Sequence, residues 1–172
     1  MRHTDLQIPE FYRRYVLPIQ DMPLFGALDY AMKQTMGIIR GLSEERGAYR
    51  YQPEKWTIKE VLCHMLDTER IMGYRALRFA RNDKTALAGF DENSYAPEAN
   101  AANRTLAVIA AEAVNLRNST VDLFAGFTPE MLTRTGNANG IEFSVNALGY
   151  IIAGHSLHHC RVLVERYHVK RQ

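Results

Sequence analysis

The sequence lacks long apolar runs and has only two cysteines among its 172 residues. A membrane-spanning helix needs about 20 consecutive apolar residues, so we expect no membrane partner. Cys63 and Cys160 lie in helical patterns and lack the CxxC spacing of a thiolate zinc site. We therefore expect two buried free thiols rather than a disulfide framework.

The sequence also lacks an excess of charge of either sign. It has 21 Lys and Arg against 19 Asp and Glu, a formal net charge of +2, and the basic residues are scattered. A nucleic-acid-binding protein concentrates positive charge on one surface, so we expect no nucleic-acid partner. The opening segment MRHTDLQIPEFYRRY has neither the apolar stretch nor the cleavage signal of a secretory leader. This predicts a cytoplasmic protein.

What remains is the composition of one folded domain. Hydrophobic residues make up 47% of the chain and charged residues 23%, the balance of an ordinary globular protein. A chain of this length buries enough surface to fold without disulfides. We predict a single domain over residues 1–172.

Apolar residues recur at three- and four-residue spacing in four long segments, which predicts an all-α four-helix bundle. Thr57 and Glu60 form a capping box at the start of the second helix, and Ser144 caps the fourth. The lead-in segment around Phe11 is expected to form a turn or short helix, and the loop before Ser144 to include a short extended piece around Ile141. The predicted helices span residues 21–42, 57–81, 106–126 and 144–167.

A long connection separates the second helix from the third. Residues 83–103 lack clear periodicity, and a connection of about 20 residues is unusual inside a compact domain. We predict a crossover over one end of the bundle. It either lines a substrate entrance or merely packs against the helices, and the side chains in question are Phe90, Asp91, Glu92, Asn93 and Tyr95.

Three histidines interrupt the apolar pattern of the fourth helix. At about 100° per residue, His155 and His159 fall at the centre of its apolar face and His158 on its flank. A buried imidazole with an unpaired ring nitrogen costs about 1–3 kcal/mol, whereas histidines one turn apart can bind one metal ion. His64, at the edge of the second helix's apolar stripe, supplies a third ligand. The pattern predicts an open three-histidine site, although ordinary core histidines remain the alternative.

Asp67, Glu69 and His158 are the candidate catalytic residues. Glu69 lies near the middle of the second helix's apolar stripe, where a structural ion pair with Arg161 or Arg166 is the competing interpretation. Asp67 lies on the same side as His64 and could orient an imidazole or be a solvated helix residue.

Two known metal motifs do not match. Ser156 stands where the HExxH motif of metalloproteases places its glutamate, and the paired Glu-x-x-His motifs of di-iron bundles are missing. An acid or base for catalysis must therefore come from elsewhere in the chain.

Three segments together resemble the DinB-like, or YfiT-like, metalloproteins. They read WTIKEVLCHMLDTERIMGYRALRFARND, GFDENSYA and NGIEFSVNALGYIIAGHSLHHCRVLVERY, and the similarity runs from about Asp21 to Tyr167. The resemblance implies a four-helix bundle, usually a homodimer, that holds one divalent ion through three histidines. The matching positions are His64, His155 and His159.

The same resemblance implies several activities, because relatives include thiol S-transferases, a thiol-dependent isomerase and proteins described as metal-dependent hydrolases. Our leading hypothesis is a divalent-metal-dependent enzyme that transfers a low-molecular-weight thiol to a small electrophile. The alternatives are a hydrolase that uses a metal-activated water and a non-catalytic bundle that binds a metal or small ligand. We expect zinc or nickel first, with iron and manganese also compatible.

Overall fold

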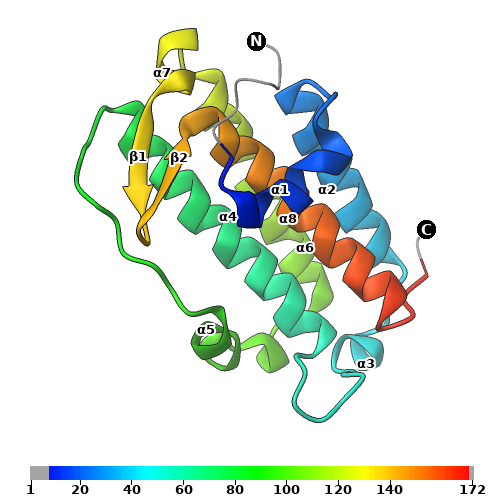
Figure 1. Ribbon diagram of the computed structural model, residues 1–172. Helices are drawn as coiled ribbons and strands as arrows, with labels where there is room; N and C mark the ends of the chain where they lie inside the picture. The colour runs from blue at the N-terminus through cyan, green and yellow to red at the C-terminus, as the bar shows by residue number, and fades with distance from the viewer. Residues whose placement is uncertain (1–7, 171–172) are drawn as a thin grey trace.

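The computed structural model describes residues 8–170 (Figure 1). Residues 1–7 and 171–172 lie outside the described part, and with them about half of the segment that we examined for a secretory leader. Within residues 8–170, no helix combines the length and apolar character that a membrane crossing requires.

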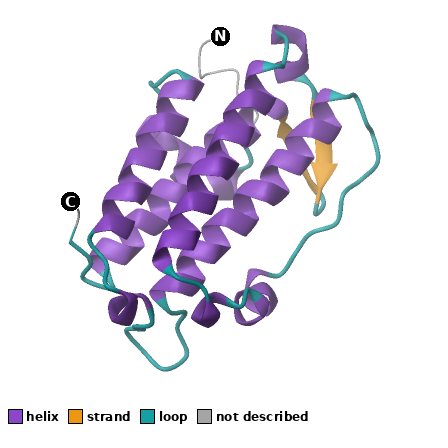
Figure 2. Ribbon diagram, turned by 180° about the vertical axis from the view of Figure 1, so that it is seen from behind, coloured by secondary structure: helices purple, strands orange, loops and turns teal. Residues whose placement is uncertain are grey.

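Four long helices form the bundle, as predicted. Helix α8 packs against both α2 and α4, and α6 packs against the same two helices, so α2 and α4 lie diagonally opposite each other. Figures 1 and 2 show the four helices from opposite sides. The bounds are α2 (Leu24–Arg40), α4 (Ile58–Ala80), α6 (Leu106–Ala125) and α8 (Val145–Glu165).

The predicted caps and buried thiols are present. In the capping box, the Thr57 backbone N–H donates to Glu60 Oε2 at 2.6 Å, and the Glu60 N–H donates to Thr57 Oγ1 at 3.2 Å. Ser144 Oγ accepts from the Ala147 N–H at 3.2 Å at the start of α8. These caps satisfy orphan backbone donors of the two helices that carry the candidate site. Both cysteines are buried, and neither forms a disulfide within the described residues.

Short helices occupy the connections. The lead-in segment forms α1, and Pro129 begins the short α7. The predicted position of the crossover over one end of the bundle was wrong: the crossover is partly helical and runs along the side of the bundle from the end of α4 to α5, which packs on α4 (Figure 2). The elements are α1 (Glu10–Val16), η2 (Leu17–Ile19), α3 (Glu44–Gly47), α5 (Glu92–Glu98), η3 (Ala101–Asn103) and α7 (Pro129–Thr133).

A two-stranded hairpin replaces the turn-rich loop expected before α8. Strand β1 (Thr135–Ala138) pairs antiparallel with β2 (Ile141–Ser144) through a two-residue turn. The turn residues have positive φ, 55° at Asn139 and 74° at Gly140, as the Asn-Gly turns of tight hairpins require. The hairpin also holds the crossover, because the Leu87 N–H donates to Asn137 O at 2.9 Å and Leu87 O accepts from the Asn139 N–H at 2.9 Å.

Gly154 lets α1 approach α8 closely. A Cβ at Gly154 would lie 2.1 Å from the backbone oxygen of Tyr15, an atom that cannot move without shifting α1. We expect Gly154→Ala to lower the free energy of unfolding by about 1–3 kcal/mol, measured by urea denaturation, because overpacking forces backbone shifts. Gly73→Ala is the matched control, since nothing lies within 4 Å of its added Cβ. Equal stability of the two variants would contradict the prediction.

Candidate metal centre

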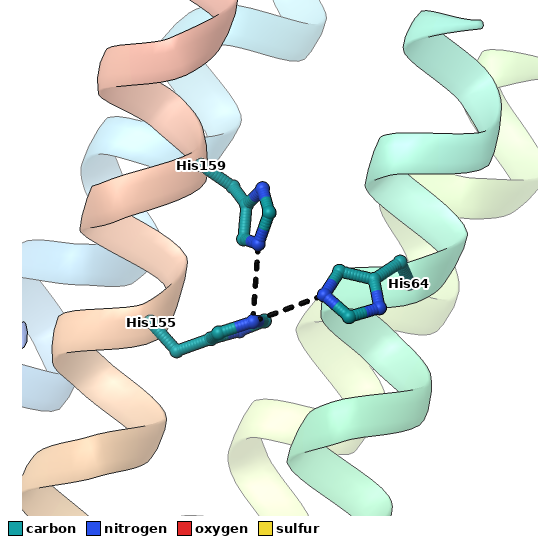
Figure 3. Close-up of side chains that lie close together, drawn as sticks. All are labelled: His64, His155 and His159. Atoms are coloured by element: carbon teal, nitrogen blue, oxygen red, sulfur yellow. Dashed lines mark hydrogen bonds between the residues drawn. The ribbon is translucent and has the colours of Figure 1, made fainter. Parts of the chain in front are cut away.

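The three predicted histidines converge from two neighbouring helices (Figure 3). His155 Nε2 lies 3.0 Å from His64 Nε2 and 3.1 Å from His159 Nε2. One ligand atom from each residue lies within 4.8 Å of the other two. His64 and His155 are buried, and His159 is partly buried. The fold thus brings together His64 and His155, which are 91 positions apart in the sequence.

This geometry fits a metal ion better than a hydrogen-bonded trio. Each ring nitrogen carries either one lone pair or one hydrogen, so His155 Nε2 can form only one good hydrogen bond with its two close neighbours. Zinc–nitrogen bonds of about 2.0–2.1 Å in a tetrahedral site place the nitrogens about 3.3 Å apart. The two separations from His155 Nε2 are close to that value, all three ligand atoms lie within 4.8 Å of one another, and the donor set is one that divalent transition metals accept.

Burial keeps these imidazoles neutral, the form that binds metal. Desolvation lowers the pKa of His64 to about 4 and, with smaller contributions from His64 and His158, lowers the pKa of His159 to about 3. The pKa of His155 is also lowered well below its ordinary value by burial and then by the neighbouring imidazoles. At neutral pH all three rings therefore offer a lone pair without first losing a proton.

Aromatic packing surrounds the histidine rings. The Trp56 ring lies 4.9 Å from that of His64, and the Tyr15 ring lies 5.7 Å from that of His155, between centroids. Metal-binding histidines commonly donate their second N–H to a carboxylate or carbonyl, but within residues 8–170 His159 Nδ1 has no hydrogen-bond partner. Ring packing is therefore the visible constraint on orientation here.

Asp67 does not reach the histidines. It is partly buried on α4, its Oδ1 lies 3.8 Å from Arg70 Nη1, and burial raises its pKa. With Ser94 and Tyr95 it lines a separate pocket between α4 and α5. No hydrogen bond joins it to His64 in the described part of the chain, so the geometry offers no support for an orienting role.

Glu69 forms the buried ion pair that was the competing interpretation, but with a different arginine. Arg117 Nε and Nη2 donate to its two carboxylate oxygens, each at 2.8 Å, and Thr120 Oγ1 donates to Oε1 at 2.8 Å. The predicted partners Arg161 and Arg166 were wrong, because the side chains that meet the Glu69 carboxylate, Arg117 and Thr120, come from α6 and not from the end of α8. Glu69 lies outside the lining of the histidine cavity.

His158 is the candidate catalytic residue that the structure brings to the histidine cavity. Its ring lies 5.1 Å from both the Tyr15 and His159 rings, between centroids. Burial, and then the charges of Arg161 and Arg14, lower its pKa. A neutral imidazole at neutral pH can accept a proton.

The histidines open onto a cavity of about 420 Å³. It is bounded by α1, α4, α8, the hairpin and the crossover, and Phe90 and Glu92 are the crossover residues in its wall. Of the entrance residues proposed from the sequence, Tyr95 instead lines the pocket beside Asp67. The sequence analysis missed several lining residues, among them Tyr12, Trp56, Thr68 and Arg75.

Acid is expected to destabilise the metal-free protein. The ordinary histidine pKa of 6.5 falls to about 4 for His64 and about 3 for His159 in the folded chain. Below pH 6.5 the two histidines therefore take up protons in the unfolded chain but stay neutral in the folded chain. The free energy of unfolding consequently decreases as the pH is lowered. We expect a loss of about 1.4 kcal/mol per pH unit for each such ring, measured by urea denaturation in chelator. If the free energy of unfolding depended on pH as steeply in His64→Gln as in wild type, this prediction would be wrong.

The fold and the site together define the class of protein: a four-helix bundle with three inward-facing imidazoles on two adjacent helices. More particularly, the chain is a member of the DinB superfamily, whose family model matches residues 27–163. The fold is similar to that of YfiT from Bacillus subtilis, described as "a probable metal-dependent hydrolase with an unusual four-helix bundle topology". The TM-score is 0.69 at 15% identity, over 95% of this chain and 92% of that one. No curated protein sequence matches the chain.

Proposed function

We propose that the chain is a divalent-metal-dependent enzyme that transfers a low-molecular-weight thiol to a small electrophile. His64, His155 and His159 would hold the ion, with zinc or nickel the first candidates. The observation that carries the proposal is the convergence of three Nε2 atoms at the wall of a cavity of about 420 Å³. Three protein ligands leave part of the coordination sphere open to that cavity.

The chain's own residues supply the setting for this reaction. The three neutral imidazoles would hold the ion from two helices, and Trp56 and Tyr15 pack against the rings of His64 and His155. When bound, the ion supplies a Lewis acid that lowers the pKa of a coordinated thiol or water. His158 is the side chain that we propose takes up the released proton, since it lines the cavity and its ring lies 5.1 Å from that of His159, between centroids.

The balance of the reaction can be followed with an epoxide as the electrophile. The sulfur forms a bond to one ring carbon, the bond from that carbon to oxygen breaks, and the oxygen keeps the electron pair. The proton that left the thiol ends on the new hydroxyl, carried by His158. No external oxidant or reductant is needed.

The cavity wall favours a thiol over water as the nucleophile. Hydrolysis needs a base to activate water and an acid to protonate the leaving group. Within the described part of the chain, Glu92 is the carboxylate that lines the cavity, and it is exposed. Glu69 is held by Arg117 elsewhere. A thiol with a lowered pKa needs less help, because the thiolate is already the nucleophile.

Hydrolysis is the second candidate. Glu92 and His158 both line the cavity and could divide the roles of base and acid. YfiT, which has a similar fold, is described as "a probable metal-dependent hydrolase". Such a reaction would proceed without any thiol.

We also propose, from the family resemblance, that the chain forms a homodimer, which light scattering would test. The cytoplasmic location stays a prediction.

The experiment supplies purified protein with zinc, nickel, iron or manganese, one of several thiols (cysteine, N-acetylcysteine or glutathione) and an epoxide or chlorodinitrobenzene. Conjugation that depends on metal and is lost in His64→Ala supports thiol transfer. A parallel reaction uses nitrophenyl esters without thiol, and turnover there alone supports hydrolysis. Tight metal binding without turnover in either reaction would leave the non-catalytic bundle as the better description.

A further inference from the structure

Arg75 is a buried cation in the wall of the histidine cavity. Only 4% of it is exposed. Its Nη2 donates to Ala88 O at 3.1 Å, and its Nη1 lies 3.7 Å from Met72 Sδ. Among residues 8–170 no carboxylate lies within ion-pair distance of its guanidinium, and burial lowers its pKa. Its positive charge is therefore not balanced by the described side chains.

The contrast with Arg117 shows how unusual this is. Arg117 is equally buried, at 5% exposure, but two of its nitrogens hold the Glu69 carboxylate at 2.8 Å each. Buried charges in proteins are ordinarily paired, because desolvation is costly. A cation left unpaired where a cavity meets it is in place to bind an anionic ligand.

A second unsatisfied group lies between Arg75 and the histidines. Thr68 is 3% exposed and lines the same cavity, and within the described chain its Oγ1 has no hydrogen-bond partner. His64, Thr68, Met72 and Arg75 all line the cavity at spacings of four, four and three residues. This spacing places them along one face of α4. His64 and Arg75 are separated by about 16 Å along the helix axis, so one small ion cannot contact both.

We propose that the cavity binds an elongated small molecule whose carboxylate pairs with Arg75 and whose reacting end lies at the three histidines. Thr68 Oγ1 hydrogen-bonds a polar atom between the two ends. This proposal rests on the proposed function for the position of the reacting end, and on Arg75 and Thr68 for the rest. Under this proposal, either the thiol or the electrophile is a carboxylic acid.

The charge balance favours a carboxylate over a phosphate. One guanidinium neutralises one negative charge, and its planar donors match the two oxygens of a carboxylate. A phosphate monoester carries between one and two negative charges at neutral pH, and the excess would lie in a cavity whose wall also holds Glu92 and, as its other cation, the exposed Arg14. Tyr12 lines the same cavity as Arg75 and adds a neutral phenol donor there; burial raises its pKa above the ordinary value of 10.0.

Calorimetric titration tests the subsite through binding rather than turnover. Zinc-loaded protein is titrated with mercaptooctanoate and with the matched neutral mercaptooctanol; zinc-free protein is titrated with octanoate and octanol. We expect the carboxylates to bind about 10- to 100-fold more tightly than the alcohols. Arg75→Met should remove this preference, and Arg75→Lys should keep part of it. The variant Arg81→Met, at the exposed C-cap of α4, is the matched control and should behave as wild type.

The outcomes separate this inference from the proposed function. A preference for carboxylate that needs Arg75 supports the subsite, even if zinc fails to bind and the proposed function falls. Zinc-dependent binding of both thiols with equal affinity overturns the subsite while leaving thiol activation intact. Retention of the preference in Arg75→Met also overturns it. If Arg75→Met does not fold, Arg75→Gln, which keeps a donor for Ala88 O, carries the same expectation.

Discussion

Replacing His155 with alanine is expected to weaken metal binding by more than about 100-fold. His155 Nε2 is the central atom of the cluster, 3.0 Å from His64 Nε2 and 3.1 Å from His159 Nε2. Even the outer partners of metal-binding side chains are worth about 10- to 100-fold in affinity, so loss of a ligand should cost more. Competition with a coloured chelator measures the dissociation constant, and elemental analysis measures the stoichiometry.

His158→Ala is the matched control for this experiment. His158 is on the same helix and its ring packs against that of His159, but its nitrogens are not part of the cluster. We expect its metal affinity to stay within a few-fold of wild type, while conjugation slows if His158 carries the proton. Comparable metal affinities in His155→Ala and wild type would eliminate the proposed centre.

Metal removal then distinguishes a catalytic ion from a structural one. An ion that binds only the folded state adds its binding free energy to stability. A catalytic site in a core that folds by itself should lose activity on metal removal with a modest change in melting temperature. Complete unfolding of the metal-free chain would instead indicate a structural ion.

The ligand positions could be predicted because helical periodicity alone decides which residues face the core. His155 and His159 lie at the centre of the apolar face of α8, and Figure 3 shows His155 pointing toward His64 and His159 pointing toward His155. The same wheel places Thr68 and Arg75 within about 40° of His64 on α4. The periodicity of α4 therefore also places a hydroxyl and a guanidinium on the face that carries His64, beyond the histidines and carboxylates that we predicted as site residues.

Partners across helices could not be predicted in this way. Periodicity shows that Glu69 faces inward, but the relative rotation and order of the helices decide which arginine meets it. Arg117 is four residues after Ala113 and three before Thr120, so its place on the inner face of α6 was readable; its pairing with Glu69 was not. The path of the crossover likewise depends on the pairing of Leu87 with the hairpin, a contact between distant segments.

Replacing Arg117 with methionine is expected to destabilise the protein by about 3–5 kcal/mol, because the change leaves the Glu69 carboxylate buried and uncompensated. Arg117 also links the bundle: its Nη1 donates to Leu28 O of α2 at 2.5 Å, and its Nη2 lies 3.3 Å from Ser156 Oγ of α8. One side chain of α6 thus contacts the other three long helices. Urea denaturation of wild type and variant at neutral pH measures the loss.

The double variant Arg117→Met with Glu69→Met isolates the cause. If the cost arises from the unpaired carboxylate, removing both charges should recover most of the lost stability, as buried pairs replaced by apolar side chains of similar size often do. A double variant as unstable as Arg117→Met would instead attribute the loss to the links with Leu28 and Ser156. Metal affinity and conjugation rate in a stable double variant then test the role of Glu69. If Glu69 is only structural, both should stay near wild type, because Glu69 lies outside the histidine cavity. A stable double variant whose rate falls more than about 100-fold would restore Glu69 to the chemistry, at about 2.7 kcal/mol of transition-state stabilisation.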